Sequence, residues 1–158
     1  MQIAKNISTT IVIAALFMSC ASKKPKTANN AQSENRKIAA SLILSDSAYV
    51  LGSEIEFLMT VTSLSEKTIE LTFPTACKSR FVVSRDDHPI WNSLEGIACA
   101  QTISHTTLAP GDTARFRAVW DCTSISEKGI FLGKYEAKAF LLSSPPVETE
   151  NATFYLVD

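Results

Sequence analysis

The chain has 158 residues, of which 46% are hydrophobic, and its formal net charge is -1. This length and apolar content exclude a disordered chain and predict one globular domain with one continuous core. The near-zero charge provides no long-range field for nucleic acid, and no stretch combines clustered Lys or Arg with stacking aromatic residues. We therefore expect no nucleic-acid partner.

The N-terminus has the layout of an export signal. A short segment carrying Lys5 precedes an apolar run from Ile7 to Phe17, which is too short for a permanent membrane-spanning helix of about 20 residues. Leu16 to Cys20 resembles a bacterial lipobox, which implies a signal peptide over residues 1–19 and a lipidated Cys20 after cleavage. The alternative, a plain secretory leader that leaves Cys20 as an ordinary thiol, stays open.

A polar stretch follows Cys20. Residues 21–36 show no apolar periodicity, so residues 20–37 are predicted to form a flexible linker behind the lipid anchor. We expect the protein in the cell envelope, attached to the membrane through Cys20. If the host is Gram-negative, Ala21 in place of aspartate resembles outer-membrane sorting, with the domain facing the periplasm.

Residues 38–158 alternate between apolar and polar side chains with a period of two, which is typical of half-buried strands. Clear examples are the segments 55–61, 69–73, 114–120, 135–141 and 154–156. Turn sequences rich in Gly, Pro, Asp and Ser separate them, and no helical pattern intervenes. This spacing predicts an all-β, immunoglobulin-like antiparallel β-sandwich, in which Gly133 to Tyr135 would form a tyrosine corner.

The order of several short motifs resembles the BsuPI-type intracellular proteinase inhibitor domain over about residues 40–158. The similar features are a Tyr-x-x-Gly entry, an Ile-x-Leu-x-Phe strand, an acidic turn before a tryptophan, a Leu-x-Pro-Gly-Asp turn and a late Trp and Gly-x-Tyr. They correspond to Tyr49 to Gly52, Ile69 to Phe73, Phe81 to Trp91, Leu108 to Asp112, Trp120 and Gly133 to Tyr135. The resemblance implies a protein partner, such as a proteinase, and identifies no reactive residue.

Three cysteines remain after Cys20, so at most one internal disulfide forms. Cys77 follows one predicted strand and Cys99 precedes another, which favours a Cys77–Cys99 bridge and leaves Cys122 as a buried or weakly reactive thiol. Pairing of Cys77 with Cys122 stays open as the alternative. No Cys-x-x-Cys spacing supports a metal site.

Nothing in the sequence predicts an enzyme, a metal or a cofactor. The two histidines, His88 and His105, accompany no nucleophile motif. His88 lies in a turn where Asp and Pro are expected for backbone reasons, and His105 lies on a predicted solvent-facing strand position. Trp120 is expected in the core, whereas Trp91 fits a core position or a contact surface equally well.

Two functional hypotheses follow. The first is an inhibitor of an envelope proteinase, which inserts an exposed loop into the proteinase cleft. The candidate residues are Lys78 and Arg80 beside Cys77, together with Trp91 and the loop from Asn92 to Ala98. The plain interpretation, that these are solvated connections, stays open. The second hypothesis is a non-inhibitory interaction or scaffolding module that presents a sheet edge or a loop.

Replacement of Cys20 tests the lipoprotein assignment. The Cys20→Ala variant should lose the lipid and move from the detergent phase to the aqueous phase on phase partition, because no other anchor is predicted. If the variant stayed membrane-associated and were processed at the same site, the assignment would be wrong.

Overall fold

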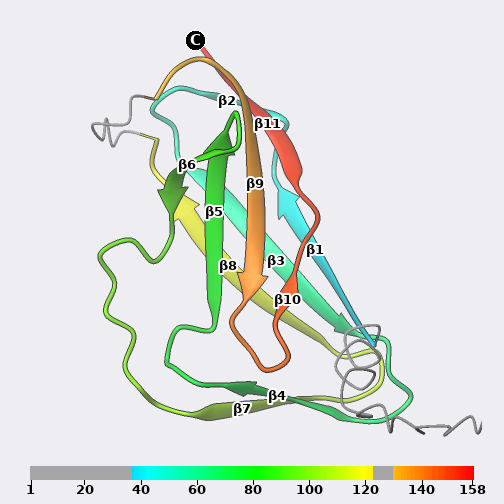
Figure 1. The fold of residues 1–158 in the computed structure, drawn as a ribbon. Helices are drawn as coiled ribbons and strands as arrows, with labels where there is room; N and C mark the ends of the chain where they lie inside the picture. The colour runs from blue at the N-terminus through cyan, green and yellow to red at the C-terminus, as the bar shows by residue number, and fades with distance from the viewer. Residues whose placement is uncertain (1–36, 123–129) are drawn as a thin grey trace, which may run out of the picture.

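The computed structural model describes residues 37–122 and 130–158 (Figure 1). The predicted signal peptide, Cys20 and most of the linker lie outside these residues. The described part of the chain is all-β, and it contains no helix long and apolar enough to cross a bilayer. Its strands are β1 (Ile38–Leu44), β2 (Ala48–Val50), β3 (Ile55–Ser63), β4 (Ile69–Phe73), β5 (Ser79–Arg85), β6 (His88–Asn92), β7 (Ser104–Leu108), β8 (Thr113–Trp120), β9 (Gly133–Leu141), β10 (Val147–Glu148) and β11 (Ala152–Val157).

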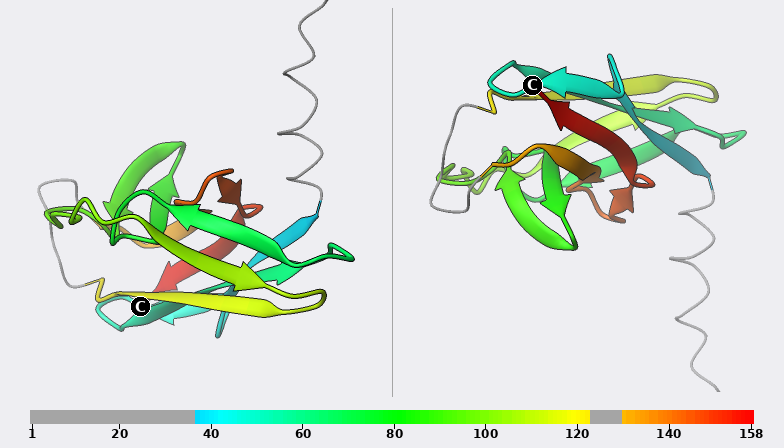
Figure 2. Two further views of the ribbon diagram at one scale, coloured as in Figure 1. Left: turned by 90° about the horizontal axis from the view of Figure 1, so that it is seen from below. Right: turned by 90° about the horizontal axis from the view of Figure 1, so that it is seen from above.

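Two sheets pack face to face, as Figure 2 shows in end views. One has the strand order β1-β3-β8 and the other the order β2-β11-β9-β5-β6, with β10 paired to β9. The predicted β-sandwich is therefore confirmed. One pair departs from the antiparallel arrangement, since β2 runs parallel to β11.

The ladder of β3 and β8 continues past a bend into the shorter ladder of β4 and β7. This second ladder crosses one end of the sandwich (Figure 1). An isolated bridge from Thr72 to Ser144 attaches it to the larger sheet. The β4–β5 connection begins at this ladder, and the β6–β7 connection ends at it. Both connections therefore reach the same end of the domain.

The alternation predicted from the sequence sets the core. Along β3, Ile55, Phe57, Met59 and Val61 are fully buried, whereas Glu56 on the opposite face is exposed. Aromatic rings from both sheets meet between the layers. The ring centroids of Phe57 and Phe154 lie 6.1 Å apart and those of Trp120 and Phe154 lie 6.5 Å apart. Such contacts add to the free energy of apolar burial.

Short turns explain the local sequence signals. Asp86 and Asp87 join β5 to β6 with φ angles of 50° and 63°. Two successive positive φ values are typical of a two-residue hairpin turn, and aspartate tolerates this conformation better than most residues. Gly111, with a φ of 78°, occupies the turn before β8, where Asp112 N–H donates to the Ala109 carbonyl at 3.0 Å.

Tyr135 forms the predicted tyrosine corner. Its ring is buried, and its hydroxyl donates to the Phe131 carbonyl at 2.7 Å and accepts from the Phe131 N–H at 3.0 Å. The residue thereby fixes the chain that enters β9 to the core.

Removing this hydroxyl should destabilise the domain. Tyr135→Phe is expected to lower the free energy of unfolding by about 1–2 kcal/mol, because two backbone groups of Phe131 lose their partner. Denaturant unfolding measures the change, and Tyr155→Phe is the control because Tyr155 is exposed. Equal effects of the two substitutions would contradict a structural role for the corner.

Candidate functional site

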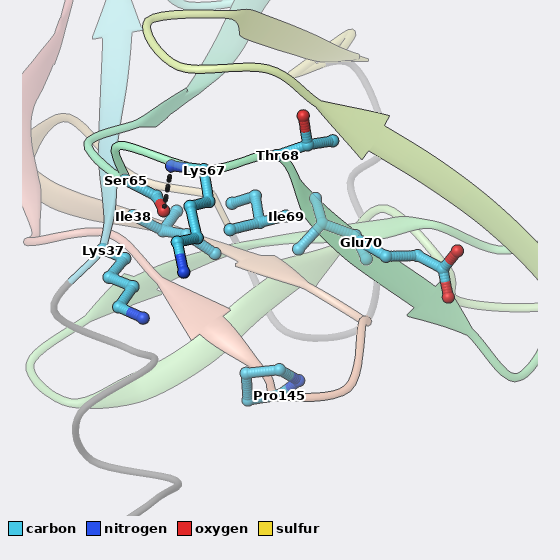
Figure 3. Close-up of a pocket in the computed structure, with 9 residues that line it drawn as sticks. Lys37, Ile38, Ser65, Lys67, Thr68, Ile69, Glu70 and Pro145 are labelled. Atoms are coloured by element: carbon cyan, nitrogen blue, oxygen red, sulfur yellow. Dashed lines mark hydrogen bonds between the residues drawn. The ribbon is translucent and has the colours of Figure 1, made fainter.

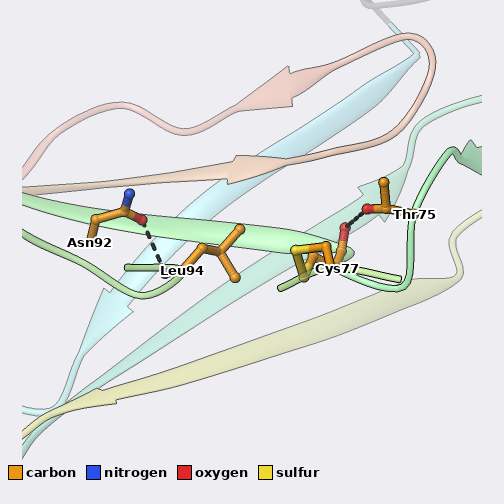
Figure 4. Close-up of a disulfide and its surroundings, with 5 residues drawn as sticks. Thr75, Cys77, Asn92 and Leu94 are labelled. Atoms are coloured by element: carbon orange, nitrogen blue, oxygen red, sulfur yellow. Dashed lines mark hydrogen bonds between the residues drawn. A yellow bond between two sulfur atoms is a disulfide. The ribbon is translucent and has the colours of Figure 1, made fainter. Parts of the chain in front are cut away.

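A disulfide joins Cys77 to Cys99, as predicted, with a Cα–Cα distance of 5.5 Å (Figure 4). Cys77 lies between β4 and β5, and Cys99 lies in the connection from β6 to β7. We call this connection, residues 93–103, the braced loop. Cys122 is free and buried, so the alternative pairing with Cys77 is not formed.

The first turn of the braced loop is held to the end of β6 and to β5. The Ser93 N–H donates to the Phe81 carbonyl at 2.9 Å, and the Ser93 hydroxyl accepts from the Phe81 N–H at the same distance. Asn92 accepts two further bonds, from Leu94 N–H to its side chain and from Glu95 N–H to its carbonyl. Figure 4 shows Leu94 beside the disulfide.

The middle of the loop is attached to the segment between β4 and β5. The disulfide lies next to a backbone bond from Ala76 N–H to the Ala100 carbonyl at 2.9 Å. Residues 97–103 have no regular secondary structure. Their path is therefore set by these attachments rather than by a sheet, and fixing a loop in this way lowers the entropy lost when it binds.

The braced loop exposes mostly uncharged side chains. Residues 95–98 and 100–103 are exposed, whereas Ser93, Leu94 and Cys99 are partly buried. Its two large exposed hydrophobic residues are Ile97, at 58% exposure, and Ile103, at 69%. A partner that covered these side chains would remove apolar surface from water, which favours association.

The structure places Arg80 in a strand rather than in an exposed loop, whereas Lys78 lies in the connection between β4 and β5 and is partly buried. Arg80 is a residue of β5, and its guanidinium lies 4.6 Å from the centroid of the Phe140 ring. Lys78 Nζ lies 5.1 Å from the centroid of the Phe73 ring. Both side chains are partly buried. Their alkyl stems and charges are used in contacts with aromatic rings of the domain itself.

Trp91 also lies in a strand, β6, rather than in a loop. Its ring stacks on Phe57 and on Trp120, with centroid distances of 5.7 Å and 6.1 Å. Trp120 is buried, as expected. Trp91 is therefore mainly a partly buried extension of the aromatic core, although it also lines a groove of about 410 Å³ with Trp120 and Val119.

Cys122 has the character of an unreactive thiol. Burial raises its pKa to about 12, and the nearby charge of Asp121 adds to the shift. A thiol with this pKa is almost wholly protonated at neutral pH, and the thiolate is the nucleophilic form.

Among the described residues, the two histidines make no contacts of the Ser-His-Asp type. His88 is exposed at the start of β6. His105, on an exposed position of β7, has Glu70 Oε1 and Thr72 Oγ1 each 3.2 Å from the same ring nitrogen, Nδ1. A proton relay of the Ser-His-Asp type needs contacts at both ring nitrogens. Among the described residues, no group of three or more His, Cys, Asp or Glu could hold a metal ion.

A groove of about 350 Å³ lies where the described chain begins (Figure 3). Lys37 and Lys67 lie along it, and Ile38, Ile69 and Pro145 provide apolar lining. The Lys67 N–H donates to the Ser65 hydroxyl at 3.1 Å. The described lining contains neither histidine nor cysteine.

A second exposed apolar surface lies near the C-terminus, at the opposite end of the domain from the start of β1 (Figure 1). Val50 is paired with Val157, and the Leu51 N–H donates to the Val157 carbonyl. Pairing of Leu156 with Gly133 brings the start of β9 beside them. We call this surface the distal apolar cluster, and its members are Val50, Leu51, Tyr155 and Val157; Phe131 and Leu132, just before β9, are also exposed.

The described residues form a β-sandwich that exposes a disulfide-tied loop and a group of apolar side chains, features that are common at protein–protein contact sites. The model of the family described as BsuPI, intracellular proteinase inhibitor, matches residues 42–146. The chain belongs to this family, as its sequence motifs suggested. A search of curated proteins finds no match.

Several solved structures show a weak likeness. Spo0M from Bacillus subtilis is 13% identical with a TM-score of 0.49, over 77% of this chain and 50% of that one. The alkylpurine DNA glycosylase AlkC from Pseudomonas fluorescens is 13% identical with a TM-score of 0.48, over 77% and 31%. A CARDB domain from Pyrococcus furiosus is 14% identical with a TM-score of 0.41, over 76% and 92%. The chain thus spans half or less of the first two proteins, and these scores do not extend the family assignment.

The sequence singled out neither Ile97 nor Ile103. Ile97 lies in the candidate loop from Asn92 to Ala98, and Ile103 lies just before β7. The sequence feature that could have indicated them is one isoleucine on each side of Cys99, in a segment without the alternation of a strand.

Removal of the disulfide should both destabilise the domain and free the loop. The double variant Cys77→Ser/Cys99→Ser is expected to lose about 3 kcal/mol of unfolding free energy on the chain-entropy model. Hydrogen exchange of the amides in residues 93–103 should accelerate, whereas the control Cys122→Ala should leave their protection unchanged. Unchanged protection in the double variant would show that the hydrogen bonds alone hold the loop.

Proposed function

We propose that this chain is a proteinase inhibitor of the bacterial cell envelope, anchored through Cys20, which acts by placing the braced loop in the active-site cleft of a proteinase. The observation that carries the proposal is the attachment of this exposed loop at two separate points. Its first turn is bonded to Phe81, and its middle is joined to Cys77.

Membership of the BsuPI family supports inhibition as the activity, and the loop geometry supports the binding mode. A loop that enters an enzyme cleft must keep its shape, because every freely rotating bond lost on binding weakens the complex. The braced loop meets this requirement with a covalent bond and backbone hydrogen bonds while its exposed side chains remain available.

The export signal and the disulfide support the envelope location. Disulfides persist in oxidising compartments and are rare in the bacterial cytosol. The leader, the lipobox resemblance and the polar linker lead to the same compartment from independent residues. The inhibitor would then act on a proteinase of the envelope, held near the membrane by the lipid on Cys20.

The distal apolar cluster favours a second candidate function, a non-inhibitory interaction module. Exposed apolar side chains gathered on one surface are typical of protein contact sites. In this alternative the partner binds around Val50 and Val157, and the braced loop has no functional contact.

Inhibition assays distinguish these functions. Full-length protein purified in detergent should inhibit at least one member of a panel of serine, cysteine and metalloproteinases. Loosening the loop in Cys77→Ser/Cys99→Ser should raise the inhibition constant about tenfold or more, since a flexible loop loses more entropy on binding. The control Val50→Ser should leave inhibition unchanged.

Lack of inhibition at high micromolar concentration would reject the inhibitor. Recovery of an envelope protein by the wild type, and its loss with Val50→Ser/Val157→Ser, would establish the interaction module instead.

A further inference from the structure

We propose that the partner proteinase has an apolar primary pocket for aliphatic side chains, and that Ile97 is the residue that fills it. This inference rests on the proposed inhibitory function and names the class of its target. It is carried by the composition and geometry of the braced loop.

The braced loop lacks the side chains that other major classes of proteinase select. Residues 93–103 read Ser-Leu-Glu-Gly-Ile-Ala-Cys-Ala-Gln-Thr-Ile, without Lys, Arg, Phe, Tyr or Trp. A pocket with an acidic base selects a cationic residue, whereas a deep hydrophobic slot selects an aromatic one. Besides Glu95 and Gln101, the exposed positions carry small residues and two isoleucines, and of these Ile97 and Ile103 are the side chains that complement a narrower apolar pocket.

Ile97 is the side chain that the loop presents most firmly. Gly96, with a φ of 74°, reverses the chain immediately before it, and the Ile97 N–H donates to the Leu94 carbonyl at 3.1 Å. Cys99 follows two residues later and is tied to Cys77. Ile97 thus lies between two fixed points, yet 58% of its surface is exposed.

Ile103 offers a second apolar contact from the other end of the loop. It is 69% exposed and directly precedes Ser104, the first residue of β7, which pairs with Phe73 in β4. The two isoleucines stand on either side of the disulfide in the sequence. A partner that covers both removes two β-branched side chains from water, which favours association.

The nearest cations are not alternatives for the primary pocket. Arg80 stacks on Phe140 from the neighbouring strand, and its Nε is buried. Lys78 lies over Phe73. To enter a cleft, either side chain would first have to leave its aromatic contact.

Three substitutions in the full-length protein test this assignment. Wild type should inhibit elastase or subtilisin, which accept aliphatic or apolar residues, more strongly than trypsin. Ile97→Ala should raise the inhibition constant about tenfold or more, as expected for a central contact residue. Ile43→Ala is the matched control, because Ile43 is 50% exposed on β1 and should leave inhibition unchanged. Ile97→Lys should shift inhibition towards trypsin.

The outcomes separate this inference from the proposed function. Strong trypsin inhibition that disappears in Lys78→Ala or Arg80→Ala would overturn the aliphatic class while leaving an inhibitor. Equal inhibition by wild type and Ile97→Ala would overturn the role of Ile97. Thermal unfolding of each variant shows whether a loss arises from misfolding, and a folded Ile97→Ala variant with unchanged inhibition decides against the proposal. No inhibition of any class would reject the proposed function itself.

Discussion

Contact between aromatic rings of the two sheets is the interaction on which the rest of the structure depends. Phe57 contributes from the smaller sheet and Phe154 from the larger, and Trp120 and Tyr135 pack around them. Each ring buries a large apolar area, and their mutual geometry adds specificity to that burial. The core thereby fixes Phe81 in β5 and the end of β6, where the braced loop begins. Without this fixed frame, the bond between Ser93 and Phe81 would not hold the loop in one place.

The disulfide then acts locally on a loop that the core does not reach. Residues 97–103 have no strand partner, and their two isoleucines are exposed. A segment of this composition gains little free energy from its own packing, so its ordering entropy must be offset elsewhere. The Cys77–Cys99 disulfide and the hydrogen bond from Ala76 to Ala100 offset this entropy by joining the loop to the segment between β4 and β5. Because these attachments order the loop, its exposed side chains are not needed for packing and remain available for a partner.

The distal apolar cluster and the braced loop lie on different parts of the domain. The distal apolar cluster lies at the end of the domain opposite the start of β1, whereas the braced loop runs along the side of the sandwich towards the β4–β7 ladder (Figure 1). An inhibitor and an interaction module would thus use separate faces of one fold. Family membership supports the first use, and the exposed residues around Val50 support a test of the second. The proposed substitutions act on one surface at a time for this reason.

Alternation along residues 55–61 and 135–141 determined the strands and the core from sequence, because a period of two places one face of a strand against the other sheet. The odd cysteine count and the strand-end positions likewise predicted the Cys77–Cys99 pair. Only the tertiary structure decided the orientation of Arg80 and Trp91. Their contacts with Phe140 and Phe57 join strands that are distant in sequence. For the same reason the exposure of Ile97 required the fold, since a local sequence does not specify whether another strand will cover a β-branched residue.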